Sequence, residues 1–220
     1  MNPSAVIFDF DGTIVDTETP AHLSMVRTWE AHGLELDQEW WLEGLGTARP
    51  SWVEALEDQL GRALDRADVM DQRRSWKDEL TDRQPVLPGV AELIRWADAQ
   101  GLGLAVASSS EHEWVDRHLE RVGLVHHFDH VVCRDDVGGR AKPAPDVFLR
   151  ATELLGIGAT KTGVVEDSPH GLAAATAAGL RAVVVPNPLV RHLEFPDAAV
   201  ALERLDAHPP VELLKLLAAS

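Results

Sequence analysis

The sequence predicts an α/β fold, a doubly wound parallel sheet with an inserted helical subdomain. Three observations predict it: short apolar runs recur along the chain, helical patterns lie between them, and one long stretch near the N-terminus breaks the alternation. Strands that alternate with helices are typical of a parallel sheet covered by helices on both faces. A chain of 220 residues is long enough for one such domain with a modest insertion.

The predicted strands are short and rich in branched and aromatic side chains. The first, Ala5 to Phe8, has the continuous apolar character of a buried parallel strand and ends in a turn signal, Asp9-Phe10-Asp11-Gly12-Thr13. Four later runs have the same character, at 102–107, 128–133, 162–165 and 182–185. The sequence therefore predicts at least five strands.

Helical patterns separate these strands. In the first of them Val90, Leu93, Ile94 and Ala97 share one face, and Gly101 marks its end. A second pattern runs from Trp114 to Val122 and stops at Gly123. A third begins with Ser168 as N-cap and Pro169 as its first residue, and it ends at Gly179.

The stretch from about 17 to 84 looks helical and contains no convincing strand. One helix starts at Thr19-Pro20 and ends at Gly33, a second surrounds residues 52–60, and a polar third runs from about 65 to 80. Because the stretch interrupts the chain between the first strand and the rest of the sheet, we read it as an insertion. The predicted domains are a core of residues 1–16 and 86–220 and a helical domain of residues 17–85.

Composition narrows the function. The formal net charge is −16, which disfavours binding to nucleic acid or to an anionic membrane surface. Cys133 is the only cysteine, so a reducing compartment fits, and no apolar run approaches the ~18 residues of a membrane span. Residues 1–4 lack the basic region of a signal peptide. We expect a cytoplasmic protein, a monomer or weak dimer, with no nucleic-acid or membrane partner.

Polar side chains gather where the predicted strands end. Ligands of open α/β sheets bind beyond the carboxyl ends of the strands, so these residues are the candidate site. Clustered carboxylates raise one another's pKa unless a cation neutralises them, and hard oxygen ligands suit Mg²⁺. Mg²⁺ together with a lysine would receive a phosphate dianion. The candidates are Asp9, Asp11, Ser108 to Ser110, Lys142, Glu166 and Asp167.

These residue types suggest a phosphoryl transfer. Asp9 ends the first strand and can attack phosphorus to form an aspartyl-phosphate. Asp11, two residues on, can protonate the leaving oxygen and later deprotonate the hydrolytic water. Ser108 and Lys142 would hold the transferring oxygens, and Mg²⁺ would offset the charge between carboxylate and phosphate.

Four ordered motifs carry a resemblance to a known family. Asp9-Phe10-Asp11-Gly12-Thr13, Ser108, Lys142 and Glu166-Asp167 resemble the motifs of the haloacid dehalogenase (HAD) superfamily. Over nearly the whole chain the sequence is similar to the β-phosphoglucomutase-like phosphatases of that superfamily, which carry a small helical cap after the first motif. The resemblance implies a Rossmann-like core and a phosphoric monoester hydrolase that acts on a small phosphorylated metabolite, such as a sugar phosphate.

The resemblance also implies roles for single residues. Asp9 is then the nucleophile and Asp11 the acid/base. The implied Mg²⁺ ligands are Asp9, the Asp11 carbonyl, Asp167 and, directly or through water, Glu166. The implied phosphate-binding residues are Ser108, with Ser109 beside it, and Lys142. In the cap, Gly46-Thr47-Ala48-Arg49 resembles a Gly-x-x-Arg element that meets the substrate, which makes Gly46 and Arg49 the candidate substrate-binding residues.

The sequence departs from the mutase branch of that family. The mutase histidine of the first cap helix aligns with Ala21, and the lysine of the last cap helix has no clear counterpart, although Arg73 and Arg74 lie near it. These differences favour a phosphatase over the alternative, a β-phosphoglucomutase-type phosphomutase. A dehalogenase would lack an acid at the Asp11 position, and a phospho-receiver module would carry no cap.

Several candidates also have a simpler interpretation. Serines at 108–110 could cap the following helix, and Arg49 could be a solvated surface residue. Five of the seven tryptophans fall in the insertion, where we expect them to form its small core rather than to stack on bases.

Overall fold

The computed structural model describes residues 3–43, 51–198 and 200–217. The chain divides into two compact units, which are described separately. The core unit comprises Met1–Asp16 and Pro85–Ser220, and the helical unit comprises Thr17–Gln84. In the described part of the chain, none of the helices has the length and apolarity that crossing a bilayer requires.

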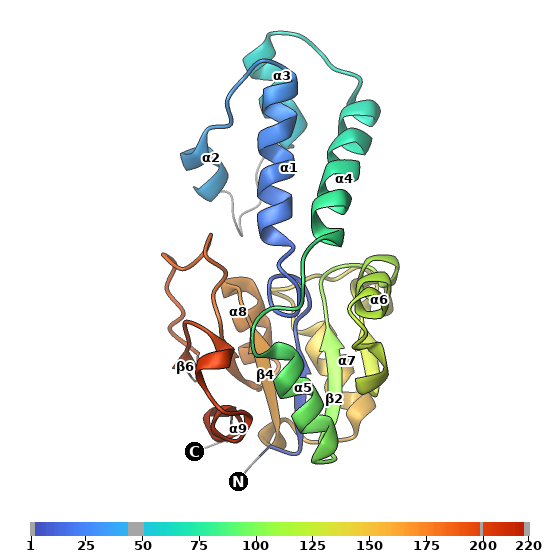
Figure 1. Cartoon of the computed structure of the whole chain (residues 1–220), viewed down its shortest axis with the longest axis vertical. Coiled ribbons are helices and arrows are strands. Elements are labelled where there is room, and N and C mark those ends of the chain that lie inside the picture. The colour runs from blue at the N-terminus through green and yellow to red at the C-terminus, as the bar shows by residue number, and fades with distance from the viewer. Residues whose placement is uncertain (1–2, 44–50, 199, 218–220) are drawn as a thin grey trace. The chain divides into compact units, whose positions relative to one another are not determined.

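The core unit is built on a parallel sheet of six strands in the order β3-β2-β1-β4-β5-β6, so the predicted fold class is confirmed (Figure 1). Because the chain first moves outward from β1 to β2 and β3 and then returns to β4, the strand order reverses beside β1, where ligands bind in such sheets. The strands are β1 (Ala5–Phe8), β2 (Gly103–Ala107), β3 (His130–Val132), β4 (Thr162–Glu166), β5 (Arg181–Val184) and β6 (Val200–Ala201).

Helices pack on both faces of this sheet, and the alternation along β1 shows why. Val6 and Phe8 point into one apolar cluster, whereas Ile7 points into the other, and all three side chains are fully buried. The first cluster contains residues of α5 (Val90–Ala99), α6 (His112–Arg121) and α9 (Pro210–Leu217). The second contains residues of α7 (Asp146–Leu155) and α8 (Pro169–Ala177).

Some observed strands end at other residues than the predicted runs, and hydrogen bonds explain two of these differences. The run 128–133 gives only the three residues of β3, because the amide of Cys133 donates to Asp136 of the short 3-10 helix Arg134–Val137. Strand β4 continues to Glu166, whose carbonyl accepts from Val185. The two-residue strand β6 has too little sequence to show a periodic pattern.

The helical unit contains α1 (Glu18–Ala31), α2 (Gln38–Glu43), α3 (Trp52–Leu60) and α4 (Arg66–Asp82). Asp65 caps α4 by accepting from the amides of Ala67 and Asp68, which explains where this polar helix begins. The described part of the unit contains no strand, as predicted. The short helix α2 was not predicted from the sequence.

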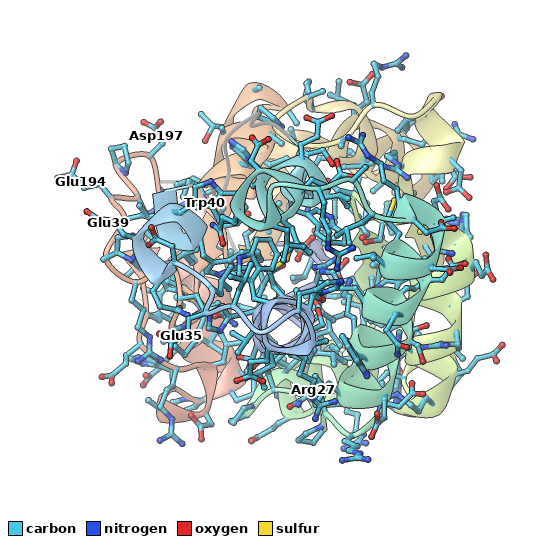
Figure 2. The ribbon with its side chains drawn as sticks, turned by 90° about the horizontal axis from the view of Figure 1, so that it is seen from above. Arg27, Glu35, Glu39, Trp40, Glu194 and Asp197 are labelled. Carbon is cyan, nitrogen blue, oxygen red and sulfur yellow. The ribbon has the colours of Figure 1, made fainter. Side chains whose placement is uncertain are left out.

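A fully buried tryptophan, Trp29, forms the centre of the helical unit. It packs against Met25, Leu36 and Leu56, and its ring lies 5.9 Å from that of Trp40 and 6.4 Å from that of Trp52. Its indole nitrogen donates to Gln59 at 2.9 Å. Charged residues of the unit, such as Glu35 and Glu39, are exposed (Figure 2). Four of the five tryptophans, Trp29, Trp40, Trp41 and Trp52, therefore belong to the core of this unit, as the composition suggested, whereas Trp76 is not part of this cluster.

Candidate active site

The loop after β1 holds Asp9 against the end of β4. The amide of Asp9 donates to the carbonyl of Val165 at 2.9 Å, and the Asp9 side chain is buried. Gly12 has a φ of +80°, and a Cβ at this position would lie 2.1 Å from a carboxylate oxygen of Asp167. Only glycine satisfies both conditions, because an L side chain is strained at this φ and would collide with the carboxylate. The Asp-Gly turn of the sequence therefore brings the loop directly onto Asp167.

Lys142 links two of the predicted carboxylates. Its ammonium group donates to Asp9 and, at 2.8 Å, to Glu166. All three side chains are almost completely buried. The lysine also lies 4.7 Å from the ring of Phe148 on α7, which fixes its direction. The structure thus unites Asp9, Lys142 and Glu166, which are far apart in sequence.

The charges of this group are not balanced. Burial raises the pKa of Asp9 to about 8, with further contributions from Glu166 and Asp11, although Lys142 partly offsets the shift. Burial lowers the pKa of Lys142, but Asp9 and Glu166 outweigh that effect and raise it well above its ordinary value. One ammonium group faces three buried carboxylates, because Asp167 lies beside Asp9 and Glu166. The negative charge of the three carboxylates therefore exceeds the positive charge of Lys142, so a bound cation would stabilise this group.

Glu166 is fixed by the start of α8. One of its oxygens accepts from the amides of Asp167 and Ser168, both at 2.8 Å, and from the Ser168 hydroxyl at 3.0 Å. A Cβ on Gly171 would come within 1.6 Å of the other oxygen, so this helix can approach the carboxylate only with glycine there. Ser168 also caps α8 by accepting from the Gly171 amide, as the sequence predicted.

Asp11 is held by side chains that the sequence reasoning did not assign to it. One of its oxygens accepts from the Ser110 hydroxyl at 2.6 Å and from Ser108 at 3.4 Å. The other accepts from the indole nitrogen of Trp114 at 2.9 Å. Trp114 lies in the first turn of α6, and 103 residues separate it from Asp11, so no local pattern could reveal the contact.

The serines after β2 connect neighbouring loops. The hydroxyl of Ser108 accepts from the amide of Ser110 at 3.0 Å, and the hydroxyl of Ser109 accepts from the amide of Lys142 at 3.0 Å. Ser108 is fully buried and Ser109 is half-buried. These bonds place both serines beside the carboxylates, and their role in phosphate binding remains a prediction.

A divalent cation fits the carboxylates. Asp9, Glu166 and Asp167 each offer an oxygen, and these oxygens all lie within 4.8 Å of one another. Oxygen ligands of this kind suit Mg²⁺, and the excess of negative charge described above is the charge that such an ion would neutralise. That Asp9, Glu166 and Asp167 bind a metal remains a prediction, which their proximity supports. The remaining predicted Mg²⁺ ligand is the backbone carbonyl oxygen of Asp11.

The predicted substrate contacts lie in the helical unit. Gly46 and Arg49 fall outside the described residues. Arg73 is half-buried, lies 5.3 Å from the centre of the Trp52 ring, and donates to the carbonyl of Ala21 at 3.5 Å. Burial lowers its pKa, and Glu18 partly opposes that effect. Arg74 is exposed.

Comparison with known proteins gives the family. Residues 6–185 match the model of the haloacid dehalogenase-like hydrolases. The chain belongs to this family. YhcW of Bacillus subtilis is 36% identical over 97% of this chain and 96% of that protein. Fructose-1-phosphate phosphatase YqaB of Escherichia coli is 35% identical over 83% of this chain and 96% of that protein.

A solved structure of the family resembles the chain as a whole. CbbY from Rhodobacter sphaeroides, in complex with phosphate, has a TM-score of 0.74 and 29% identity, and the match covers 93% of this chain and 95% of that one. The resemblance inferred from the four motifs is therefore confirmed at the level of the superfamily.

Proposed function

We propose that this HAD-family hydrolase is a Mg²⁺-dependent phosphatase that hydrolyses a small phosphorylated metabolite, a sugar phosphate, through an aspartyl-phosphate intermediate. The observation that carries the proposal is the buried group of Asp9, Lys142, Glu166 and Asp167 at the carboxyl ends of β1 and β4. Such a group combines a nucleophile with a lysine that can contact a phosphate oxygen, and its excess of negative charge is what a bound cation would offset.

In the first step a carboxylate oxygen of Asp9 attacks phosphorus. A P–O bond forms to Asp9, and the P–O bond to the alcohol breaks. Asp11, in its protonated form, gives its proton to the leaving alkoxide, so a neutral alcohol departs. Lys142 counters the charge of Asp9 and of the transferring oxygens. Ser108 and Ser109 would donate to those oxygens.

In the second step water hydrolyses the aspartyl-phosphate. Asp11, now ionised, takes a proton from the water as its oxygen attacks phosphorus, and the bond between phosphorus and the Asp9 oxygen breaks. Inorganic phosphate leaves, Asp9 is again a carboxylate, and Asp11 is again protonated. The contacts of Asp11 with Ser110 and Trp114 support this role, because they orient the carboxyl group for both transfers.

Asp9, Asp167, Glu166 and the Asp11 carbonyl are the residues that would hold Mg²⁺. When bound, the ion supplies positive charge that lowers the repulsion between the Asp9 carboxylate and the phosphate. Three clustered carboxylates with one lysine support this part of the proposal.

One relative supports the sugar-phosphate class, and a second supports the binding of phosphate. YqaB is named for a sugar phosphate, fructose 1-phosphate, and the CbbY structure contains phosphate. We propose that Arg49 and Gly46 of the helical unit contact the part of the substrate distant from the phosphate. The predicted alternative, a phosphomutase, would interconvert sugar phosphates and release almost no inorganic phosphate.

A screen of phosphorylated metabolites for phosphate release tests the proposal. We expect turnover of sugar phosphates that disappears with excess chelator and returns when Mg²⁺ is added. Full activity in excess chelator would contradict the metal requirement. Isomerisation of a sugar phosphate without phosphate release would instead support the mutase.

A further inference from the structure

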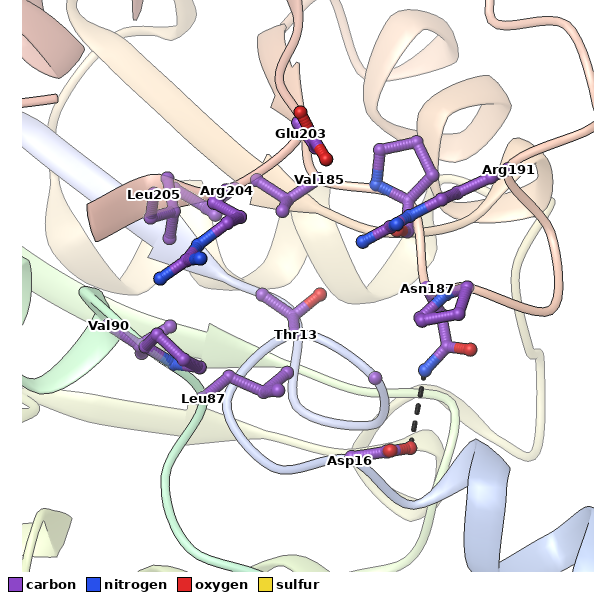
Figure 3. Close-up of a pocket in the computed structure, with 15 residues that line it drawn as sticks. Thr13, Asp16, Leu87, Val90, Val185, Asn187, Arg191, Glu203, Arg204 and Leu205 are labelled. Carbon is purple, nitrogen blue, oxygen red and sulfur yellow. Dashed lines mark hydrogen bonds between the residues drawn. The ribbon is translucent and has the colours of Figure 1, made fainter. Parts of the chain in front are cut away.

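A cavity lies in the core unit, apart from the cluster of Asp9, Lys142, Glu166 and Asp167. Its volume is about 260 Å³. Most of its wall is apolar, with Leu87, Val90, Val165, Val185 and Leu205 among the lining residues (Figure 3). None of Asp9, Lys142 and Glu166 lines it, so the proposed reaction leaves this cavity unused.

Hydrogen bonds of Asn187 hold one wall of the cavity. The buried amide of Asn187 donates to Asp16 at 3.2 Å, and its oxygen accepts from the amide of Leu189 at 3.0 Å. The bond from Asn187 to Asp16 fastens the loop after β5 to the loop after β1 (Figure 3). A preformed apolar cavity with a few polar groups is the usual form of a small-molecule site.

Two polar groups in the wall favour an anion. The hydroxyl of Thr13 is buried, and no hydrogen-bond partner is found for it among the described residues. A buried hydroxyl without a hydrogen-bond partner destabilises the folded state, so this position favours a ligand that bonds to the hydroxyl. Figure 3 shows the guanidinium of Arg191 directed toward Thr13 from the loop after β5.

The other charged residues in the wall, Asp16, Glu203 and Arg204, have polar or charged neighbours of their own. Arg204 forms an ion pair with Asp206 and lies near enough to Glu203 to be affected by its charge. Asp16 accepts from Asn187. Arg191, in contrast, donates only to the carbonyl of Pro186, at 3.4 Å, and forms no ion pair with any residue that the structure describes.

We propose that this cavity is a second binding site, for a small anion with an apolar body, such as an aromatic or branched carboxylate. The apolar body would lie against the valine and leucine side chains, and the anionic group would accept from Arg191 and Thr13. Because Gly12 and Thr13 directly follow Asp11, the ligand would contact the loop that carries both catalytic aspartates without occupying the site of the reaction.

Titration of the full chain with phenylacetate, followed by amide NMR, tests the proposal. We expect saturable shifts of the amides of Thr13, Val185 and Leu205, with a Kd on the order of 1 mM, typical of so small a ligand. The neutral phenylacetamide should bind about tenfold more weakly or not at all, because it cannot pair with Arg191. Shifts concentrated at Ser108, Ser109 and Lys142, or none at the cavity, would overturn the proposal.

Two variants locate the charge. Arg191→Gln should weaken phenylacetate binding about tenfold or more. Arg150→Gln, which removes an exposed arginine of α7 that does not line the cavity, should leave the affinity unchanged. Equal affinities of both variants and the unaltered protein would refute the assignment to Arg191. The fold of each variant is checked in the same spectra, so loss of structure is not mistaken for loss of binding.

Discussion

The carboxylate edge of the core unit and the interior of the helical unit are built on opposite principles. At the carboxyl ends of β1 and β4, polar partners hold each charged side chain: Asp9 and Glu166 hold the buried Lys142, and Ser110 and Trp114 hold the half-buried Asp11. The interior of the helical unit consists of packed tryptophan rings around Trp29. The comparison teaches that the proposed chemistry depends on a few polar residues held by polar partners, whereas the helical unit is held together by apolar packing.

The largest expected effect comes from a substitution of the proposed nucleophile, Asp9. Asp9→Asn replaces the nucleophile by an amide, so kcat for the best substrate should fall by at least about 10³-fold. Phosphate release under saturating substrate and Mg²⁺ measures it. The matched control is Asp197→Asn, which alters an exposed carboxylate of the core unit and should keep full activity (Figure 2). Retention of more than a few per cent of kcat in Asp9→Asn would exclude Asp9 as the nucleophile.

The next prediction concerns the stability of the helical unit. Trp29→Ala removes a fully buried indole, so the free energy of unfolding of this unit should fall by about 3–5 kcal/mol. Urea unfolding with hydrogen exchange measures the loss unit by unit. Exchange should rise in α1 and α3 but not in β1 and β4. In the control, Trp76→Ala, the side chain removed is only half-buried, and the loss should be smaller. A uniform rise in exchange across both units would show that they unfold together.

A third prediction concerns which unit recognises the substrate. If Arg49 binds the part of the substrate distant from the phosphate, Arg49→Ala should lower kcat/KM for the best sugar phosphate about 10- to 100-fold. A small aryl phosphate offers no such group, so its kcat/KM should hardly change. The control is Arg62→Ala, at an exposed arginine of the same unit. Equal losses on both substrates would assign Arg49 to the fold or to the reaction itself.

The smallest effect is a pH dependence of stability in the core unit. His112 lies between Asp136, at 2.8 Å, and Asp116, at 3.0 Å. Burial lowers its pKa, but the hydrogen bonds and charges of Asp136 and Asp116 outweigh that effect and raise it. The protonated ring thus stabilises the folded state fully below the unfolded pKa of about 6.5, and the contribution is lost as the pH rises through the folded pKa.

His112→Gln should therefore destabilise the protein at pH 5.5 more than at pH 9, by urea unfolding at the two values. His126→Gln, at an exposed histidine, is the control and should show no such difference. An equal loss at both values would mean that the imidazole acts through packing rather than through its charge.

The fold could be predicted where the pattern is local. The apolar run Ala5 to Phe8 and the Ser168-Pro169 start of α8 are visible in the sequence, and the structure has β1 and α8 at these places. The short elements α2 and β6 were not predicted, because segments of six and two residues are too short to show a periodic pattern of apolar residues. Elements of this length are stabilised by their neighbours rather than by their own pattern.

The site could be predicted in part for the same reason. Asp9 follows β1, Glu166 ends β4 and Asp167 follows it, and these two strands are neighbours in the parallel sheet, so strand order alone brings the three residues together. The hydrogen bonds from Trp114 and Ser110 to Asp11 could not be predicted, since they depend on how α6 packs against the loop after β1. The cavity beside Arg191 was equally hidden, because its lining residues come from segments far apart in the chain.

The central claim is that the reaction proceeds through an aspartyl-phosphate on Asp9, and trapping of this covalent intermediate tests the claim most directly. Enzyme quenched during turnover is treated with borohydride, which reduces an acyl phosphate to an alcohol, and the peptide that contains residue 9 is analysed by mass spectrometry. We predict that Asp9 is converted to homoserine, and only in samples that contained both substrate and Mg²⁺. An unmodified Asp9 during steady turnover, or reduction at another carboxylate, would contradict the account.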